Sequence, residues 1–206
     1  MRGLAVALVA VTSFAGCLGG SSVPPRAHYV LHDEAPSKSA EPAATLKQSL
    51  VVTGSAADVF YDTENLVFSR LPGERAYYQF ASWTDRPAHL VVRLAERRLE
   101  ARGRFVSVAS LTTGVRADLV LNISVGEFYH DATVAPSVVR VELVGELVDW
   151  HTRSLLGRRR FAASAAVKTD DAKGAADAFD HAVTEALDGL VPWVEMQAGK
   201  ADAGSG

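Results

Sequence analysis

The stretch ADLVLNISV, residues 117–125, has the clearest strand pattern in the chain. From Leu119 to Val125 every second residue is a large aliphatic one, which is the period of a strand with one buried face. Asn122 and Ser124 lie on the opposite, wetter face. The segment therefore predicts a long strand that covers a hydrophobic core on one side.

Further strands are expected on both sides of this one, which we extend to residues 117–130. The segments 138–150 and 156–167 repeat the two-residue period and are joined by a short polar turn, so they predict an antiparallel hairpin. The turn sequence Leu-Pro-Gly-Glu indicates a second hairpin, because Pro presets φ and Gly permits a positive φ. Its strands, and three shorter ones, are expected at 61–70, 76–83, 28–31, 49–53 and 104–108.

Two segments instead have the spacing of amphipathic helices. The first is 87–102, which Pro87 starts and Gly103 ends. The second is 175–196, where apolar residues from Phe179 to Val194 form one stripe. The order of elements predicts an α+β fold, with a mostly antiparallel sheet and two main helices packed on one face.

The N-terminus has the features of a lipoprotein signal. Arg2 precedes an apolar run, and the small residues Ala15 and Gly16 precede Cys17, the only cysteine in the chain. We expect the mature protein to begin at Cys17 and to carry acyl chains there, which hold a protein stably on a membrane. The alternative is an ordinary cleaved signal followed by an incidental cysteine.

Composition divides the rest of the chain. Residues 1–16 are interpreted as signal peptide, and 17–27, rich in Gly, Ser and Pro, as a lipid-anchored flexible tether. Residues 28–196 form a single α+β domain, and the small polar residues 197–206 are expected to be a disordered tail. No apolar run reaches the roughly 20 residues that a membrane-spanning helix needs.

Charge and motifs exclude several functions. The net charge is −3, and it is −4 once Arg2 is removed, so nucleic acid is not an expected partner. The sequence contains no nucleophile elbow, zinc-binding cysteine pair or phosphate-binding glycine loop. The pair His130-Asp131 is interpreted as solvated turn residues. We therefore expect no enzyme activity, no cofactor and no metal.

A few side chains are candidates for contact with a partner protein. Tyr77 and Tyr78 point to opposite faces of one strand, so one packs inside and the other stays available. Trp83 ends that strand, where a large ring belongs to a core or an interface. Arg158 and Arg160 share a strand face and bind either a partner or lipid headgroups, unless the basic run only protects a sheet edge.

Several short motifs occur together in a known order. His28-Tyr29-Val30-Leu31 is followed by the segment from Asp62 to Arg70, then by Tyr77-Tyr78-Gln79-Phe80-Ala81-Ser82-Trp83 and a helix that opens at Pro87. Over residues 29–194 the chain resembles the ABC-type transport auxiliary lipoprotein family, to which paraquat-inducible protein C belongs. Asp85-Arg86 departs from this family's pattern, because many relatives have a Pro pair there.

The resemblance implies a non-enzymatic periplasmic lipoprotein in a lipid transport system. Its partners would be the permease and a substrate-binding subunit of the mammalian cell entry class, and its site the periplasmic face of the outer membrane, which Leu18 after Cys17 favours. The sequence leaves a homo-oligomer open. One alternative is a carrier that encloses a lipid or another hydrophobic ligand in its own cavity. An anchored hydrolase is a third, but no nucleophile and base stand at a recognisable spacing.

Overall fold

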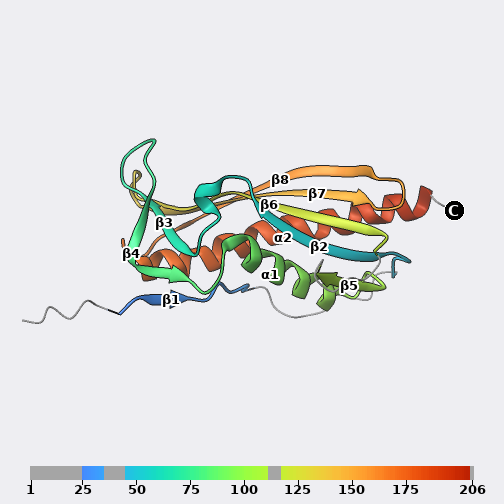
Figure 1. Cartoon of the computed structure of the whole chain (residues 1–206), viewed down its shortest axis with the longest axis horizontal. Helices are drawn as coiled ribbons and strands as arrows, with labels where there is room; N and C mark the ends of the chain where they lie inside the picture. The colour runs from blue at the N-terminus through green and yellow to red at the C-terminus, as the bar shows by residue number, and fades with distance from the viewer. Residues whose placement is uncertain (1–24, 35–44, 111–116, 205–206) are drawn as a thin grey trace, which may run out of the picture.

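The computed structural model describes residues 25–34, 45–110 and 117–204. Within these ranges eight strands, two α-helices and one short 3-10 helix follow each other along the chain (Figure 1). Their bounds are β1 Ala27–Tyr29, β2 Ser49–Ala56, η1 Val59–Tyr61, β3 Asn65–Ser69, β4 Ala76–Trp83, α1 Pro87–Arg102, β5 Ser107–Ser110, β6 Leu119–Asp131, β7 Val138–Asp149, β8 Ser154–Ala166 and α2 Ala172–Gly204.

The strand β6 is the centre of the sheet, and its alternation is as predicted. Leu119, Leu121, Ile123 and Val125 are buried while the residues between them are half-exposed. β6 pairs antiparallel with β7, and β7 pairs antiparallel with β8, which confirms the hairpin of long strands. The hairpin of β3 and β4 is also confirmed, and Gly73 in its turn has a φ of 78°.

The sheet is mixed, so the prediction of a mostly antiparallel sheet is wrong. β2 and β3 both run parallel to β6, β5 runs parallel to β2, and β1 runs parallel to β4. The alternation of apolar residues reports which face of a strand is buried, but it is the same for both strand directions. The helix α1 lies between β4 and β5 in sequence, and such crossover connections allow parallel pairing.

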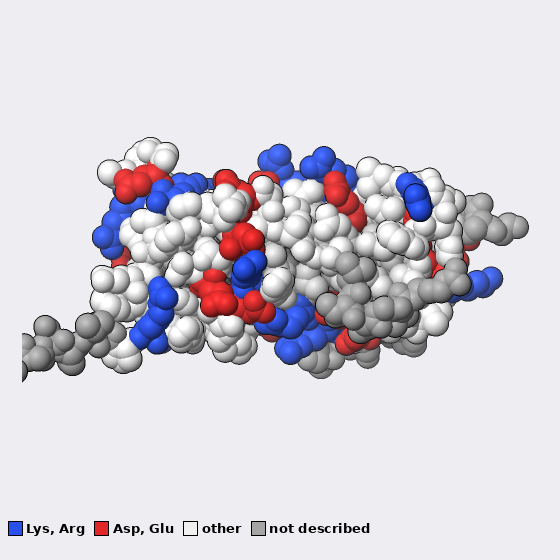
Figure 2. All heavy atoms as spheres, viewed as in Figure 1, with Lys and Arg blue, Asp and Glu red and all other residues white. Residues whose placement is uncertain are grey.

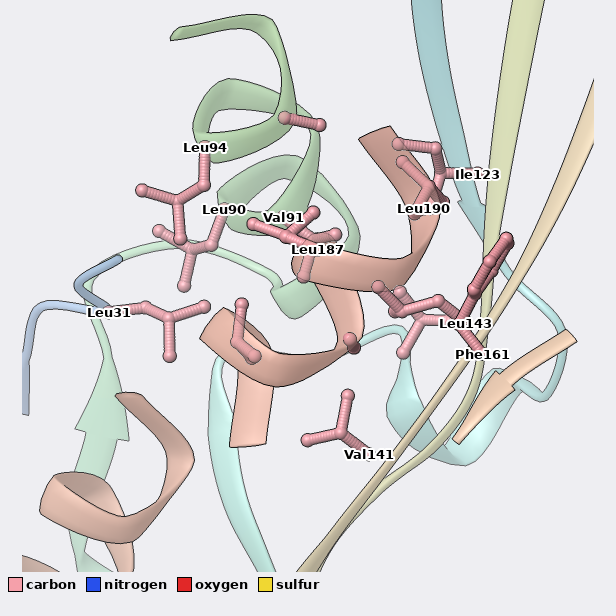
Figure 3. Packing of buried hydrophobic residues seen from close by; sticks show 14 of the residues in the cluster. Leu31, Leu90, Val91, Leu94, Ile123, Val141, Leu143, Phe161, Leu187 and Leu190 are labelled. Carbon is pink, nitrogen blue, oxygen red and sulfur yellow. The ribbon is translucent and has the colours of Figure 1, made fainter. Parts of the chain in front are cut away.

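Both helices pack on the same face of the sheet, as predicted. Gly54 of β2 lies under α1, because a Cβ atom there would come within 2.5 Å of Val92 Cγ2. Gly54 pairs with Ile123, and Ile123 pairs with Gly145 of β7, which lies under Trp193 of α2. Figure 3 shows leucine and valine side chains of both helices meeting those of the sheet in one core.

The two helices differ in how well their ends follow the prediction. α1 spans the predicted residues, starts at Pro87 and ends at Gly103, whose φ of 59° is left-handed. α2 instead runs to Gly204, eight residues beyond the predicted end, so the tail expected to be disordered is helical up to that point. Ala198 is fully buried there, which explains why small residues continue the helix.

The domain is elongated along α2 (Figure 1). β1, β3, β4 and the start of α2 lie at one end, which we call the tether end because the described chain begins there. The turn between β7 and β8 and the last turns of α2 lie at the other. Within the described ranges, no helix is both long and apolar enough to cross a membrane.

Candidate functional site

An irregularity in β4 creates a hollow at the tether end. Asn65 pairs with Ser82 and Val67 pairs with Tyr77, so the single residue Leu66 of β3 stands opposite four residues of β4. Such a bulge bends its strand and turns side chains away from the regular alternation. All four of these β4 residues, 78–81, line the hollow.

This pocket has a volume of about 480 Å³ and combines four parts of the chain. Its aromatic residues come from β1, β3 and β4, its single charged group follows β3, and α2 contributes its first residue. The lining consists of Tyr29, Phe68, Arg70, Tyr77, Tyr78, Gln79, Phe80, Ala81 and Ala172. Several of these side chains are exposed, so the pocket is an open surface hollow with aromatic walls.

Tyr78 forms the inner wall and is fixed by a buried histidine. Its Oη lies 2.7 Å from Nδ1 of His130, and the two rings are parallel within 6°. Burial raises the pKa of Tyr78 to about 12, and burial lowers the pKa of His130. Both groups are therefore neutral at neutral pH, and this wall of the pocket carries no charge.

The outer wall is more exposed and holds the charge. The Tyr77 ring stacks on Phe60 at 4.6 Å, and 41% of the residue's surface is exposed. The Arg70 guanidinium lies 4.9 Å from the centre of the Phe68 ring, and it forms no ion pair within the described residues. The site thus offers aromatic faces and one cation, which suits a ligand with an anionic group and apolar parts.

The comparisons with known proteins agree with this fold. The family model of the ABC-type transport auxiliary lipoprotein component matches residues 29–191, from the last residue of β1 into α2. The chain belongs to this family. No curated protein sequence matches it.

Solved structures of other proteins share the fold of this auxiliary lipoprotein. Protein XCC0632 from Xanthomonas campestris, of the family DUF330, has a TM-score of 0.69 and 24% identity, over 87% of this chain and 98% of its own. The hypothetical protein CT253 from Chlamydia trachomatis has a TM-score of 0.51 and 12% identity, over 74% of this chain and 98% of its own. At these identities the likeness shows the fold alone.

The structure brings two of the predicted contact residues of the auxiliary lipoprotein together and corrects a third. Tyr77 and Tyr78 line one pocket, where Tyr77 is exposed and Tyr78 is half-buried against the core. Trp83 is only 1% exposed, so it is core and offers no surface to a partner. Its ring packs edge-on against Phe128 and Phe179, and Phe179 lies on α2, far away in sequence.

Arg158 and Arg160 lie far from this pocket, on the sheet face that the helices leave open. Both are exposed and share this face, and each lies near a carboxylate of β7: Arg158 is 3.2 Å from Glu146 and Arg160 is 3.5 Å from Glu142. Exposed pairs of this kind contribute little stability. Because the carboxylates partly neutralise them, the two arginines do not form a strongly basic patch.

Sequence reasoning did not single out Arg70, Phe80 or Tyr29 as parts of one site. All three stand inside the family motifs, but their common location follows from the pairing of β1 with β4 and from the bulge in β4. A cluster of aromatic residues at 77–80 was the available signal. Cys17 lies outside the described residues.

Ser49, Asp118 and His151 lie together elsewhere in the domain, and they do not form a catalytic triad. Asp118 Oδ2 accepts hydrogen bonds of 2.7 Å from both the backbone N–H and the hydroxyl of Ser49, and its Oδ1 lies 2.9 Å from His151 Nε2. The carboxylate stands between the serine and the histidine, so the histidine does not contact the hydroxyl that it would have to deprotonate in a triad. Asp118 joins the starts of β2 and β6 to the β7–β8 turn.

The pair His130-Asp131 is likewise structural. Both residues are buried, so the interpretation as solvated turn residues is wrong. Asp131 accepts a 2.7 Å hydrogen bond from Arg140, whereas His130 contacts Tyr78, so the two side chains have separate partners. Among the described residues, no group of three or more His, Cys, Asp or Glu side chains could hold a metal ion.

Proposed function

We propose that this protein is a non-enzymatic, lipid-anchored subunit of an ABC-type lipid transport system. The family model that spans the domain from β1 to α2 carries this proposal, since the family consists of transport auxiliary lipoproteins. The lipoprotein signal that ends at Cys17 supports the anchor. Ser49 and His151 both bond to Asp118 and His130 bonds to Tyr78, so none of these histidines contacts the serine, which favours a structural over a catalytic role.

The location and the partners follow from the same reasoning. Leu18 after Cys17 favours the periplasmic face of the outer membrane. There the protein docks the components of a transporter whose substrate-binding subunit belongs to the mammalian cell entry class, together with its permease. Contacts between copies of the chain would fit such a docking role.

The mechanism we propose is geometric. Nine residues, 18–26, lie between Cys17 and Ala27, and an extended chain over these ten steps reaches roughly 30 Å. The sheet and both helices share one continuous core, so the domain behaves as a rigid body on this tether. Arg158 and Arg160, on the open sheet face, are the proposed partner contacts.

A carrier function is the second candidate, and the pocket favours it. Its volume falls within the range of roughly 300–1,000 Å³ that small ligands occupy. An open hollow covers only part of a two-chain lipid, however, and a shuttle must shield the acyl chains from water. Native mass spectrometry separates the two functions: a carrier retains one lipid per chain outside the membrane, and a docking subunit does not.

Chemical crosslinking in cells tests the docking function. We compare the wild type with an Arg158→Glu/Arg160→Glu variant. The control is Lys200→Glu, which also replaces an exposed basic side chain by an acidic one, but on α2. The proposal predicts crosslinks to a permease or substrate-binding subunit in the wild type and the control, and fewer in the double variant. Crosslinks only to proteins unrelated to transport would contradict it.

A further inference from the structure

We propose that the tether end of the domain lies on the membrane surface and that its pocket receives the phosphodiester headgroup of a bilayer phospholipid. This inference deepens the proposed function and rests on the lipid anchor at Cys17. It assigns the pocket a positioning role, because a bound headgroup fixes the orientation of the domain on the membrane.

The place where the chain leaves the domain supports this position. Ala27 pairs directly with Ala81, which lines the pocket, and Tyr29 lines it as well. The chain from Cys17 to Ala27 has ten residue-to-residue steps, and a flexible chain of that length has a typical end-to-end distance of about 17 Å. The lipid anchor therefore keeps the pocket close to the bilayer surface.

When the long axis of the domain is perpendicular to the membrane, the opposite end of the domain lies far from the bilayer surface. α2 starts at Ala172 in the pocket and continues for 33 residues to Gly204. A helix of that length spans about 50 Å. Lys200 and the β7–β8 turn thus lie far beyond the typical reach of the tether, which makes them suitable reference points.

The exposed side chains at the tether end have the composition of a membrane interface. Tyr77 and Phe80 are 41% and 37% exposed, and the apolar residues Val30 and Leu71 nearby are 53% and 61% exposed. Aromatic residues are enriched where proteins meet the headgroup layer, because their rings are amphipathic. In Figure 2 this end of the visible face is mostly uncharged, with basic side chains and a smaller number of acidic ones between the uncharged atoms.

Arg70 supplies the group that recognises a phosphodiester. It is exposed at the pocket, and its guanidinium lies over the Phe68 ring without an ion pair in the described parts of the chain. A planar guanidinium binds phosphate oxygens through two parallel hydrogen bonds. The Tyr78–His130 wall behind it is itself uncharged, and the carboxylates of Asp170 and Asp171 act on this pair from just before the start of α2.

The test places a single fluorescent label in the pocket of the acylated full-length protein. Cys17 is the only cysteine and is consumed by acylation, so Gln79→Cys creates a unique thiol, and Lys200→Cys creates a matched one at the far end. Each bimane-labelled protein is reconstituted into phosphatidylethanolamine–phosphatidylglycerol vesicles that contain phosphatidylcholine with a nitroxide headgroup. Thermal unfolding confirms that both variants are folded.

We expect the fluorescence at position 79 to fall by about two-fold or more, since interfacial side chains sit roughly 5–10 Å into the headgroup boundary. The label at position 200 should remain unquenched. Adding Arg70→Gln to the position 79 variant should reduce the quenching, because one cation near an anionic surface changes binding by about five-fold. Since Arg70 is exposed, this change should leave the unfolding temperature unaltered.

Equal quenching at positions 79 and 200, or none at position 79, would overturn the inference while leaving the anchor intact. Unchanged quenching in the Arg70→Gln protein would overturn the headgroup assignment. Intact mass recorded before reconstitution reports acylation separately. A chain without acyl groups would remove the anchor, and with it this placement of the pocket.

Discussion

Tyr78 and His130 are joined by a 2.7 Å hydrogen bond between two rings that are parallel within 6°. The histidine is 1% exposed, and its second ring nitrogen, Nε2, has no hydrogen-bond partner within the described residues, with Asp170 at 3.9 Å. The tyrosine is therefore the group that satisfies this buried side chain. The inner wall of the pocket depends on the pair.

Removing the hydroxyl should destabilise the domain. Tyr78→Phe leaves Nδ1 of His130 buried without a partner, which costs about 1–3 kcal/mol. Urea denaturation measures this change, and Tyr77→Phe is the control, because the Tyr77 hydroxyl forms only a 3.3 Å hydrogen bond at the surface. If the free energy of unfolding decreased equally in both variants, the buried Tyr78–His130 hydrogen bond would contribute no more stability than the surface one.

Acidification should weaken the fold through His130. Burial lowers the pKa of His130 below the ordinary value of 6.5, so below that pH the unfolded chain binds a proton that the folded chain does not. The free energy of unfolding should therefore decrease as the pH falls below 6.5. Denaturant titrations of His130→Gln should show a flatter pH dependence, whereas His32→Gln, at an exposed histidine, should follow the wild type.

A second, more acidic transition should come from Asp118. The N–H of Ser49, then His151 and the Ser49 hydroxyl, lower the pKa of Asp118 to about 2. The stability from this carboxylate is complete above pH 3.8 and is lost as the pH falls through about 2. Asp118→Asn should remove this part of the pH profile. An unchanged profile near pH 3 would contradict the assignment.

The contact between the two helices includes a buried charge. Arg102 holds Glu195 in a two-point ion pair, with one contact of 2.7 Å, and the Glu195 side chain is 7% exposed. Arg102→Met strands this carboxylate and should cost about 3 kcal/mol, whereas Arg102→Met/Glu195→Met should recover most of the loss. Chemical denaturation of both variants measures the difference. A double variant as unstable as the single one would contradict this account.

The close approach of α1 to the sheet should make Gly54 sensitive to the smallest addition. A Cβ atom there would lie 2.5 Å from Val92 Cγ2 and 3.2 Å from two backbone oxygens, so Gly54→Ala should cost about 1–3 kcal/mol. Gly199→Ala is the control, since its Cβ would lie 3.8 Å from Leu46, and alanine favours a helix by about 1 kcal/mol. The unfolding temperature should fall in the first variant and rise in the second.

The sequence predicted those parts of the fold that depend on local pattern. The faces of β6, β7 and β8 follow from the two-residue period, and the ends of α1 follow from Pro87 and Gly103. The parallel direction of β2, β3 and β5 could not be predicted in this way, because the two-residue period is the same for parallel and antiparallel strands. The length of α2 was missed because Ala198 and its neighbours look like a polar tail until their burial is known.

The candidate site was less predictable because it depends on contacts distant in sequence. Tyr29, Arg70 and Ala172 meet only after β1 pairs with β4 and α2 returns to the tether end. The sequence left Trp83 open as a core or an interface residue, because nothing in it places Phe179 against this ring. The aromatic character of 77–80 was visible, but the four-residue bulge that forms the pocket was not.

The most direct test of the central claim is mass spectrometry of the wild-type protein extracted from native membranes in mild detergent, with intact mass and co-purifying proteins measured in one preparation. Our account predicts a chain that begins at Cys17, carries acyl groups there, and co-purifies with the permease or substrate-binding subunit of an ABC transport system. A chain with an unmodified Cys17 and no transporter subunit would contradict it.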